Sequence, residues 1–99
     1  MHSFFCRLLP PRTTFAQDMT EAEAALMQQH AVYWQGLLER RRAVTFGLVA
    51  DPAGAHGIAI VEVEHPDEVR ALTEQDPTIV ADRVFRWEIF PMPFGAVHA

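Results

Sequence analysis

Four short apolar segments and two helical ones follow one another along this chain in an order that few folds accept. Strands are predicted at residues 3–9, 44–49, 57–64 and 84–90, and helices at residues 20–41 and 66–76. Prolines follow the first and last strands, and a proline cannot donate to a strand ladder. The order β-α-β-β-α-β predicts an α+β, ferredoxin-like fold, in which two helices cover one face of a four-stranded antiparallel sheet.

The first helix has a clear start and one apolar face. Thr20 and Glu23 have the spacing of a capping box, in which each side chain accepts from the backbone N–H of the other residue. The apolar and aromatic positions then recur at the spacing of one helix face: Leu26, His30, Tyr33, Trp34, Leu37 and Leu38. Three arginines, residues 40–42, are expected in the last turn, where they complement the helix dipole.

The third strand carries apolar side chains on both faces. Ile58 and Ile60 point one way, whereas Ala59, Val61 and Val63 point the other. The helices can cover only one face of the sheet. A second copy of the chain covering the other face is therefore expected, and the sequence predicts a homodimer.

The chain of 99 residues has room for one domain, residues 1–99. A net charge of −5 and a single basic cluster argue against a nucleic-acid partner. No apolar run is long enough for a membrane helix, and no secretory signal is seen. The lone Cys6 cannot form an intrachain disulfide, so a reducing, cytoplasmic location is expected.

Several short motifs occur in a specific order along almost the whole chain, and together the pattern resembles the YCII-related family. The motifs are Met19-Thr20, His30-x-x-Tyr33-Trp34, Gly47, Gly54, Gly57-Ile58, Glu62-Val63, Asp76-Pro77 and Glu88-Ile89-x-Pro91-Met92. The resemblance implies a ferredoxin-like fold that pairs into a dimeric α/β barrel. It also implies an active site built on a helix His and the Asp of the Asp-Pro turn, which are His30 and Asp76 here. The chain departs from the family pattern at Arg41-Arg42-Ala43, where the family usually has a Gly, and at Gly47-Leu48, where it usually has Gly-Pro.

His30 and Asp76 are the candidate catalytic residues, and each also has a structural explanation. His30 lies on the buried helix face, where an imidazole with a satisfied N–H can simply belong to the core. Asp76 before Pro77 is a good N-cap for a short turn over residues 78–81. Both roles can coexist: a carboxylate that binds one ring nitrogen leaves the other nitrogen to take a proton from a substrate.

Arg7, Tyr33 and Trp34 are candidate substrate-binding residues. Arg7 could bind a carboxylate or stabilise an enolate if it faces the cavity, and otherwise it is an outward-facing strand residue. Tyr33 and Trp34 could orient a ligand, but aromatic residues on a buried helix face more often belong to the core.

No metal site or cofactor is expected. His2, His56, His65 and His98 lack a metal-ligand spacing, and His2 and His98 are expected to be terminal and solvated. The sequence has no phosphate loop, serine nucleophile motif or dinucleotide fingerprint. Cys6 has no base near it in the sequence, so we interpret it as a small buried residue rather than a nucleophile.

These features suggest a cofactor-free enzyme that transfers a proton on an unknown small organic molecule, in an isomerisation or an elimination. The alternative is a non-catalytic dimer that binds a metabolite or serves a partner enzyme, because one fold hosts unrelated functions. An open cavity beside His30 and Asp76 would favour the enzyme, and a sealed His30 would favour the accessory module.

Overall fold

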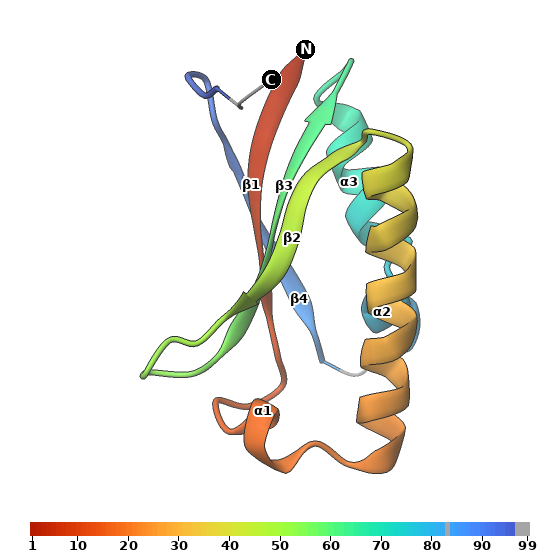
Figure 1. Ribbon diagram of the computed structural model, residues 1–99, viewed down its shortest axis with the longest axis vertical. Coiled ribbons are helices and arrows are strands. Elements are labelled where there is room, and N and C mark those ends of the chain that lie inside the picture. The colour runs from red at the N-terminus through yellow and green to blue at the C-terminus, as the bar shows by residue number, and fades with distance from the viewer. Residues whose placement is uncertain (83, 97–99) are drawn as a thin grey trace.

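The four strands form one antiparallel sheet in the order β2-β3-β1-β4 (Figure 1). The computed structural model describes residues 1–82 and 84–96. The strands are β1 (His2–Leu9), β2 (Ala43–Val49), β3 (His56–Val63) and β4 (Arg86–Pro91). β1 pairs with β3 and β4, and β3 also pairs with β2. Because β1 and β3 lie at the centre, the two inner strands carry most of the buried side chains of the sheet.

The helices lie on one side of the sheet (Figure 1). The long helix α2 (Glu21–Glu39) lies along the sheet, and α3 (Asp67–Glu74) contacts it where the Tyr33 hydroxyl donates to the carbonyl of Leu72. Two single-turn helices, α1 (Phe15–Asp18) and α4 (Pro77–Val80), flank them. The predicted α+β, ferredoxin-like arrangement is therefore confirmed. None of the helices in the described ranges is both long and apolar enough to cross a membrane.

The strand register divides the sheet residues between the two faces. Cys6 pairs with Ala59 and Phe4 with Val61, and these side chains meet the helices. From α2, Trp34 and Leu37 reach the same layer, and Trp34 is fully buried. A second buried cluster, made of Leu8, Phe15, Leu26 and Phe85, lies next to the first. Trp87 of β4 packs against both clusters and joins them.

In the part of the chain that the structure describes, the opposite face of the sheet has no helix over it (Figure 1). Phe5, Ile60 and Phe90 lie there, and the rings of Phe5 and Phe90 are 6.1 Å apart. Arg7 and Glu88 pair on the same face, with their side-chain atoms 2.6 Å apart. The expected apolar character of both faces of β3 is thus present in the structure.

The capping box at the start of α2 forms as expected, since Thr20 and Glu23 each accept from the backbone N–H of the other residue. The segment expected to be a loop before it contains α1. The last strand begins at Arg86 and not at Val84, because Val84 has a φ of 66°, which a strand does not accommodate.

The helix α2 ends at Glu39, so the three arginines follow the last turn and do not lie within it as expected. The N–H of Arg42 donates to the carbonyl of Leu37, and the N–H of Arg41 donates to that of Leu38. This pair of hydrogen bonds is a Schellman motif, whose C′ residue adopts the left-handed conformation. Arg41 occupies that position with a φ of 59°.

We predict that Arg41→Gly stabilises the protein. A left-handed conformation costs a non-glycine residue roughly 1–2 kcal/mol, and the extra freedom of glycine in the unfolded chain cancels only part of that gain. The expected increase in the free energy of unfolding is about 0.5–1 kcal/mol, measured by urea denaturation. Arg40→Gly is the matched control, because Arg40 has a φ of −86° and glycine there should destabilise the helix end. Equal effects of the two substitutions on the free energy of unfolding would contradict the assignment of Arg41 to the left-handed C′ position.

Candidate functional site

Asp76 is held at the start of α4 by the turn that it caps. Its Oδ1 accepts from the backbone N–H of Thr78 at 2.8 Å and from the Thr78 hydroxyl at 2.9 Å. Pro77 follows at the first helical position, where its missing N–H costs nothing. The N-cap expected from the Asp-Pro pair is therefore formed, and it fixes one carboxylate oxygen completely.

The other oxygen of Asp76 joins α4 to α2. Oδ2 lies 2.8 Å from His30 Nδ1 and 2.7 Å from Trp34 Nε1. His30 and Trp34 are one helical turn apart, so both side chains reach the same carboxylate from one face of α2. The capping turn and the His-Asp contact coexist in one residue.

Asp76 is fully buried, yet it is the ionised form that its surroundings favour. Burial raises the pKa of the carboxyl, but the hydrogen bonds from His30, Trp34 and the Thr78 backbone outweigh it and hold the pKa below its ordinary value. An ionised carboxylate can only accept hydrogen bonds, so the proton between the two groups belongs on His30 Nδ1. The neutral imidazole then carries its lone pair on Nε2.

Two indoles lie together on one side of His30. The rings of Trp34 and Trp87 each lie 6.4 Å from the His30 ring and 5.3 Å from each other, and Trp87 is inclined to the His30 ring by only 28°. The His30 side chain keeps 12% of its surface exposed. A ring held by one hydrogen bond and two aromatic neighbours is well placed to present Nε2 in a fixed direction.

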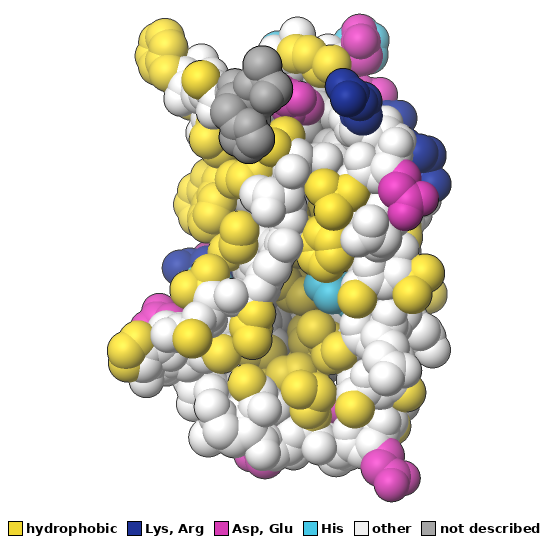
Figure 2. All heavy atoms as spheres, in the orientation of Figure 1, with side chains coloured by type: hydrophobic (Ala, Val, Ile, Leu, Met, Phe, Trp, Pro, Cys, Tyr) yellow, Lys and Arg dark blue, Asp and Glu magenta, His cyan; other side chains and the backbone are white. Residues whose placement is uncertain are grey.

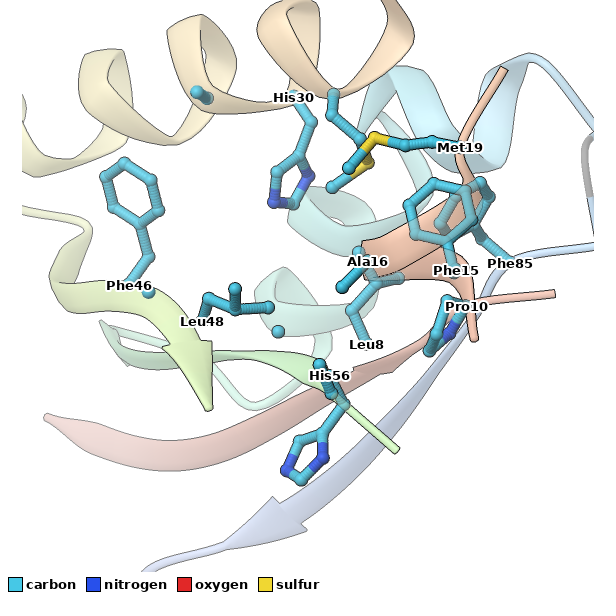
Figure 3. Close-up of a pocket in the computed structure, with 15 residues that line it drawn as sticks. Leu8, Pro10, Phe15, Ala16, Met19, His30, Phe46, Leu48, His56 and Phe85 are labelled. Carbon is cyan, nitrogen blue, oxygen red and sulfur yellow. The ribbon is translucent and has the colours of Figure 1, made fainter. Parts of the chain in front are cut away.

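A cavity of 260 Å³ opens beside His30. It lies between α2, α1 and the ends of β1, β2 and β3. Figure 2 shows a hollow on this face with mostly apolar side chains and a histidine at its edge. Figure 3 shows His30 pointing from α2 into this space. The apolar side chains that line it are Leu8, Pro10, Phe15, Ala16, Met19, Met27, Ala31, Phe46, Leu48, Ala55 and Phe85.

His56 borders the cavity but does not present its ring to it. It pairs with Val49 at the start of β3, and Figure 3 shows its side chain directed away from the cavity. Its Nδ1 lies 3.3 Å from the carbonyl oxygen of Gly54, within the hairpin. His30 is thus the ionisable side chain that points into the cavity among the residues that the structure describes.

The three residues predicted to bind substrate lie outside the cavity lining in the described part of the chain. Trp34 is buried and acts as a donor to Asp76. The Tyr33 hydroxyl donates to the carbonyl of Leu72, and burial followed by the nearby charge of Asp76 raises the pKa of Tyr33. Arg7 points to the helix-free face and binds Glu88. The structure therefore favours the core and outward-facing alternatives for these residues.

The remaining chemical groups lie elsewhere. Cys6 is fully buried, and burial raises its thiol pKa to about 12, so the sulfur is not a thiolate at neutral pH. His2 is exposed in β1, whereas His98 lies outside the described residues. Within residues 1–82 and 84–96, no three His, Cys, Asp or Glu side chains gather closely enough to hold a metal ion.

The cavity walls were not predicted as site residues. Phe15 and Met19 come from a segment expected to be a loop, and Phe46 and Leu48 come from a strand. The sequence signal for this wall is the presence of the apolar residues Phe15, Ala16 and Met19 between Arg12 and Thr20, where a solvated loop would carry polar residues. Arg12 organises this wall: its guanidinium lies over the Phe15 ring and binds Asp18 and Glu23.

We predict that Asp76→Asn lowers the free energy of unfolding at neutral pH by roughly 2 kcal/mol, because the buried donors lose a charged acceptor. Folding lowers the Asp76 pKa below its ordinary 3.8. The stabilisation is therefore present above that pH and is lost as the pH falls through the folded-state value.

Urea denaturation at a series of pH values tests this. The difference between wild type and Asp76→Asn should shrink as the medium becomes more acidic than the ordinary carboxyl pKa of about 4. Asp67→Asn, at an exposed carboxylate, is the control and should change stability little. A difference for Asp76→Asn that stays constant across the series would contradict the buried, ionised carboxylate.

The sequence and the fold were compared with those of known proteins. No curated protein matches the sequence. Among solved structures, the chain is similar to the 5-chloro-2-hydroxyhydroquinone dehydrochlorinase from Burkholderia phenoliruptrix AC1100, in complex with 2,5-dihydroxybenzoquinone. The identity is 19% and the TM-score is 0.56, over 86% of this chain and 90% of that chain, a likeness that bears on the fold. The YCII-related domain family matches residues 4–93, almost the whole chain, and the chain therefore belongs to this family.

Proposed function

We propose that this protein is an enzyme that transfers a proton on a small organic molecule, with His30 as the general base and Asp76 as its positioning residue. The observation that carries the proposal is the 2.8 Å contact between His30 Nδ1 and Asp76 Oδ2 beside an open cavity. Asp76 does not line the cavity, so its role is exerted through His30.

The proposed proton transfer follows from the tautomer of His30. Nε2 of the neutral imidazole takes a proton from an acidic C–H of the substrate, and the electron pair of that bond moves into the substrate. Asp76 stabilises the imidazolium that forms. In an isomerisation the imidazolium returns the proton to another carbon, whereas in an elimination the electron pair expels a leaving group.

The comparisons support an enzyme over an accessory module. The similar solved structure is of an enzyme whose name, a dehydrochlorinase, denotes an elimination, and it holds a small ring compound. The cavity beside His30 also has the arrangement expected of an active site, a mostly apolar pocket with one well-placed polar group. A protein that only contacts a partner enzyme does not need this space.

We predict that the wild-type protein accelerates exchange of the α-hydrogens of cyclohexanone in deuterated water, followed by NMR. This exchange reports proton abstraction, the step common to isomerisation and elimination. His30→Ala should lower the exchange rate by about 10²- to 10⁴-fold. Asp76→Asn should lower it at least about tenfold, because the ring loses its fixed tautomer.

His65→Ala is the matched control, because His65 is exposed on the loop before α3 and should leave exchange unchanged. Exchange in His30→Ala at the wild-type rate would exclude His30 as the base. A wild-type protein that binds the ketone beside His30 without exchanging its hydrogens would instead support the non-catalytic, metabolite-binding function.

We also propose that the active form is a homodimer, a dimeric α/β barrel in which two sheets face each other. The supporting observation is the helix-free face of the sheet, where Phe5, Ile60 and Phe90 lie together and Phe90 is 47% exposed. A second copy covering this face would remove a contiguous apolar surface from water.

Analytical ultracentrifugation at micromolar concentration should give twice the mass of one chain. Ile60→Arg should shift the protein to monomer, because it places a charge in the middle of that face. Val32→Arg is the control, since Val32 is 74% exposed on the outer side of α2 and should leave the dimer intact. A wild-type protein that sediments only as monomer would contradict the proposed barrel.

A further inference from the structure

Among the residues that the structure describes, the lining of the cavity beside His30 has no permanently charged side chain that could neutralise a charged ligand, and His30 itself is uncharged while its Nε2 carries no proton. Its lining contains no Lys, Arg, Asp or Glu among the residues that the structure describes. Arg12 lies over the ring of Phe15, but Asp18 and Glu23 already hold its guanidinium. Arg7 lies on the opposite face of the sheet, bound to Glu88.

We propose that the substrate is an uncharged, largely apolar molecule no larger than about one ring, which presents a single acidic hydrogen to His30. This inference rests on the proposed function, because it takes His30 Nε2 as the group that meets the substrate. It adds the charge, the size and the polarity of that substrate.

The energetic cost of burying an unpaired ion in the cavity indicates that the substrate is uncharged. A carboxylate, phosphate or ammonium group that enters an apolar cavity loses its hydration, and no opposite charge in the lining compensates it while His30 is neutral. Asp76 cannot serve a cation, because its two oxygens are taken by His30, Trp34 and Thr78. An uncharged molecule avoids this cost and gains from contact with the aromatic walls, Phe15, Phe46 and Phe85.

The cavity volume limits the size of the substrate, and the tautomer of His30 determines which polar group the substrate needs. A cavity of 260 Å³ is smaller than the range of about 300–1,000 Å³ typical for drug-sized ligands. His30 Nδ1 donates to Asp76, so the neutral ring offers the ligand an acceptor at Nε2. A bound molecule therefore needs an O–H, N–H or acidic C–H at that point and apolar surface elsewhere.

Four one-ring probes test these properties in the full-length wild-type protein at about pH 8, where histidine is ordinarily neutral. Phenol is uncharged and has a donor, anisole is uncharged without a donor, benzoate is an anion and benzylammonium is a cation. Affinities are measured by NMR titration, with the ¹⁵N resonance of His30 Nε2 as the reporter of the donor contact.

We expect phenol to bind and to shift the Nε2 resonance. Anisole should bind at least about threefold more weakly, the loss expected for one hydrogen bond, and should not shift that resonance as a donor does. Benzoate and benzylammonium should bind at least about tenfold more weakly than phenol. Binding of either ion within this factor of phenol, or equal binding of phenol and anisole, would overturn the inference.

His30→Ala separates this inference from the proposed function. The variant should lose the preference for phenol over anisole but keep the preference for uncharged probes, because the apolar walls remain. If His30→Ala retains cyclohexanone exchange but still rejects benzoate and benzylammonium, the catalytic role fails and the charge selectivity stands. If wild type accepts the ions and His30→Ala abolishes exchange, the catalytic role stands and the substrate class fails.

Discussion

The buried carboxylate of Asp76 connects the helices beside the cavity. Asp76 receives hydrogen bonds from His30 and Trp34 of α2 and from the backbone and hydroxyl of Thr78 in α4. A buried charge is tolerable only when such partners satisfy it. The same contacts join two helices that are distant in sequence, orient the imidazole and determine which of its nitrogens faces the cavity.

The two faces of the sheet have different roles. The helix side holds the core, the carboxylate and the cavity, and its polar groups are mostly paired with one another. The helix-free side carries the apolar cluster around Phe5 and Phe90 together with the Arg7–Glu88 pair. This division explains why the cavity beside His30 has apolar walls, and why Arg7 on β1 does not contribute to them.

The sequence pattern predicted the fold better than it predicted the cavity, and the pairing of His30 with Asp76 was implied by the family resemblance and not by a local pattern. The helix periodicity and the capping box depend on neighbours within one helix, and both appear in the structure. The side of Arg7 depends on the strand register, which one residue of shift would reverse. The walls from Phe15 and Phe46 depend on how the short helix α1 and the edge strand β2 are placed relative to α2, which is a matter of tertiary packing. Arg41 is a residue whose conformation was not predicted, because its left-handed backbone follows from the hydrogen bonds that close the helix end and not from the preference of arginine.

The central claim is that Asp76 fixes His30 with a proton on Nδ1 and a free lone pair on Nε2. The most direct test is a two-dimensional ¹H–¹⁵N NMR spectrum of the histidine rings of the wild-type protein, recorded where the ring is neutral. The account predicts that the His30 resonances have the pattern of an Nδ1–H tautomer, with Nε2 at the shift of an unprotonated nitrogen. A pattern of the Nε2–H tautomer, or of rapid averaging between the two, would contradict it.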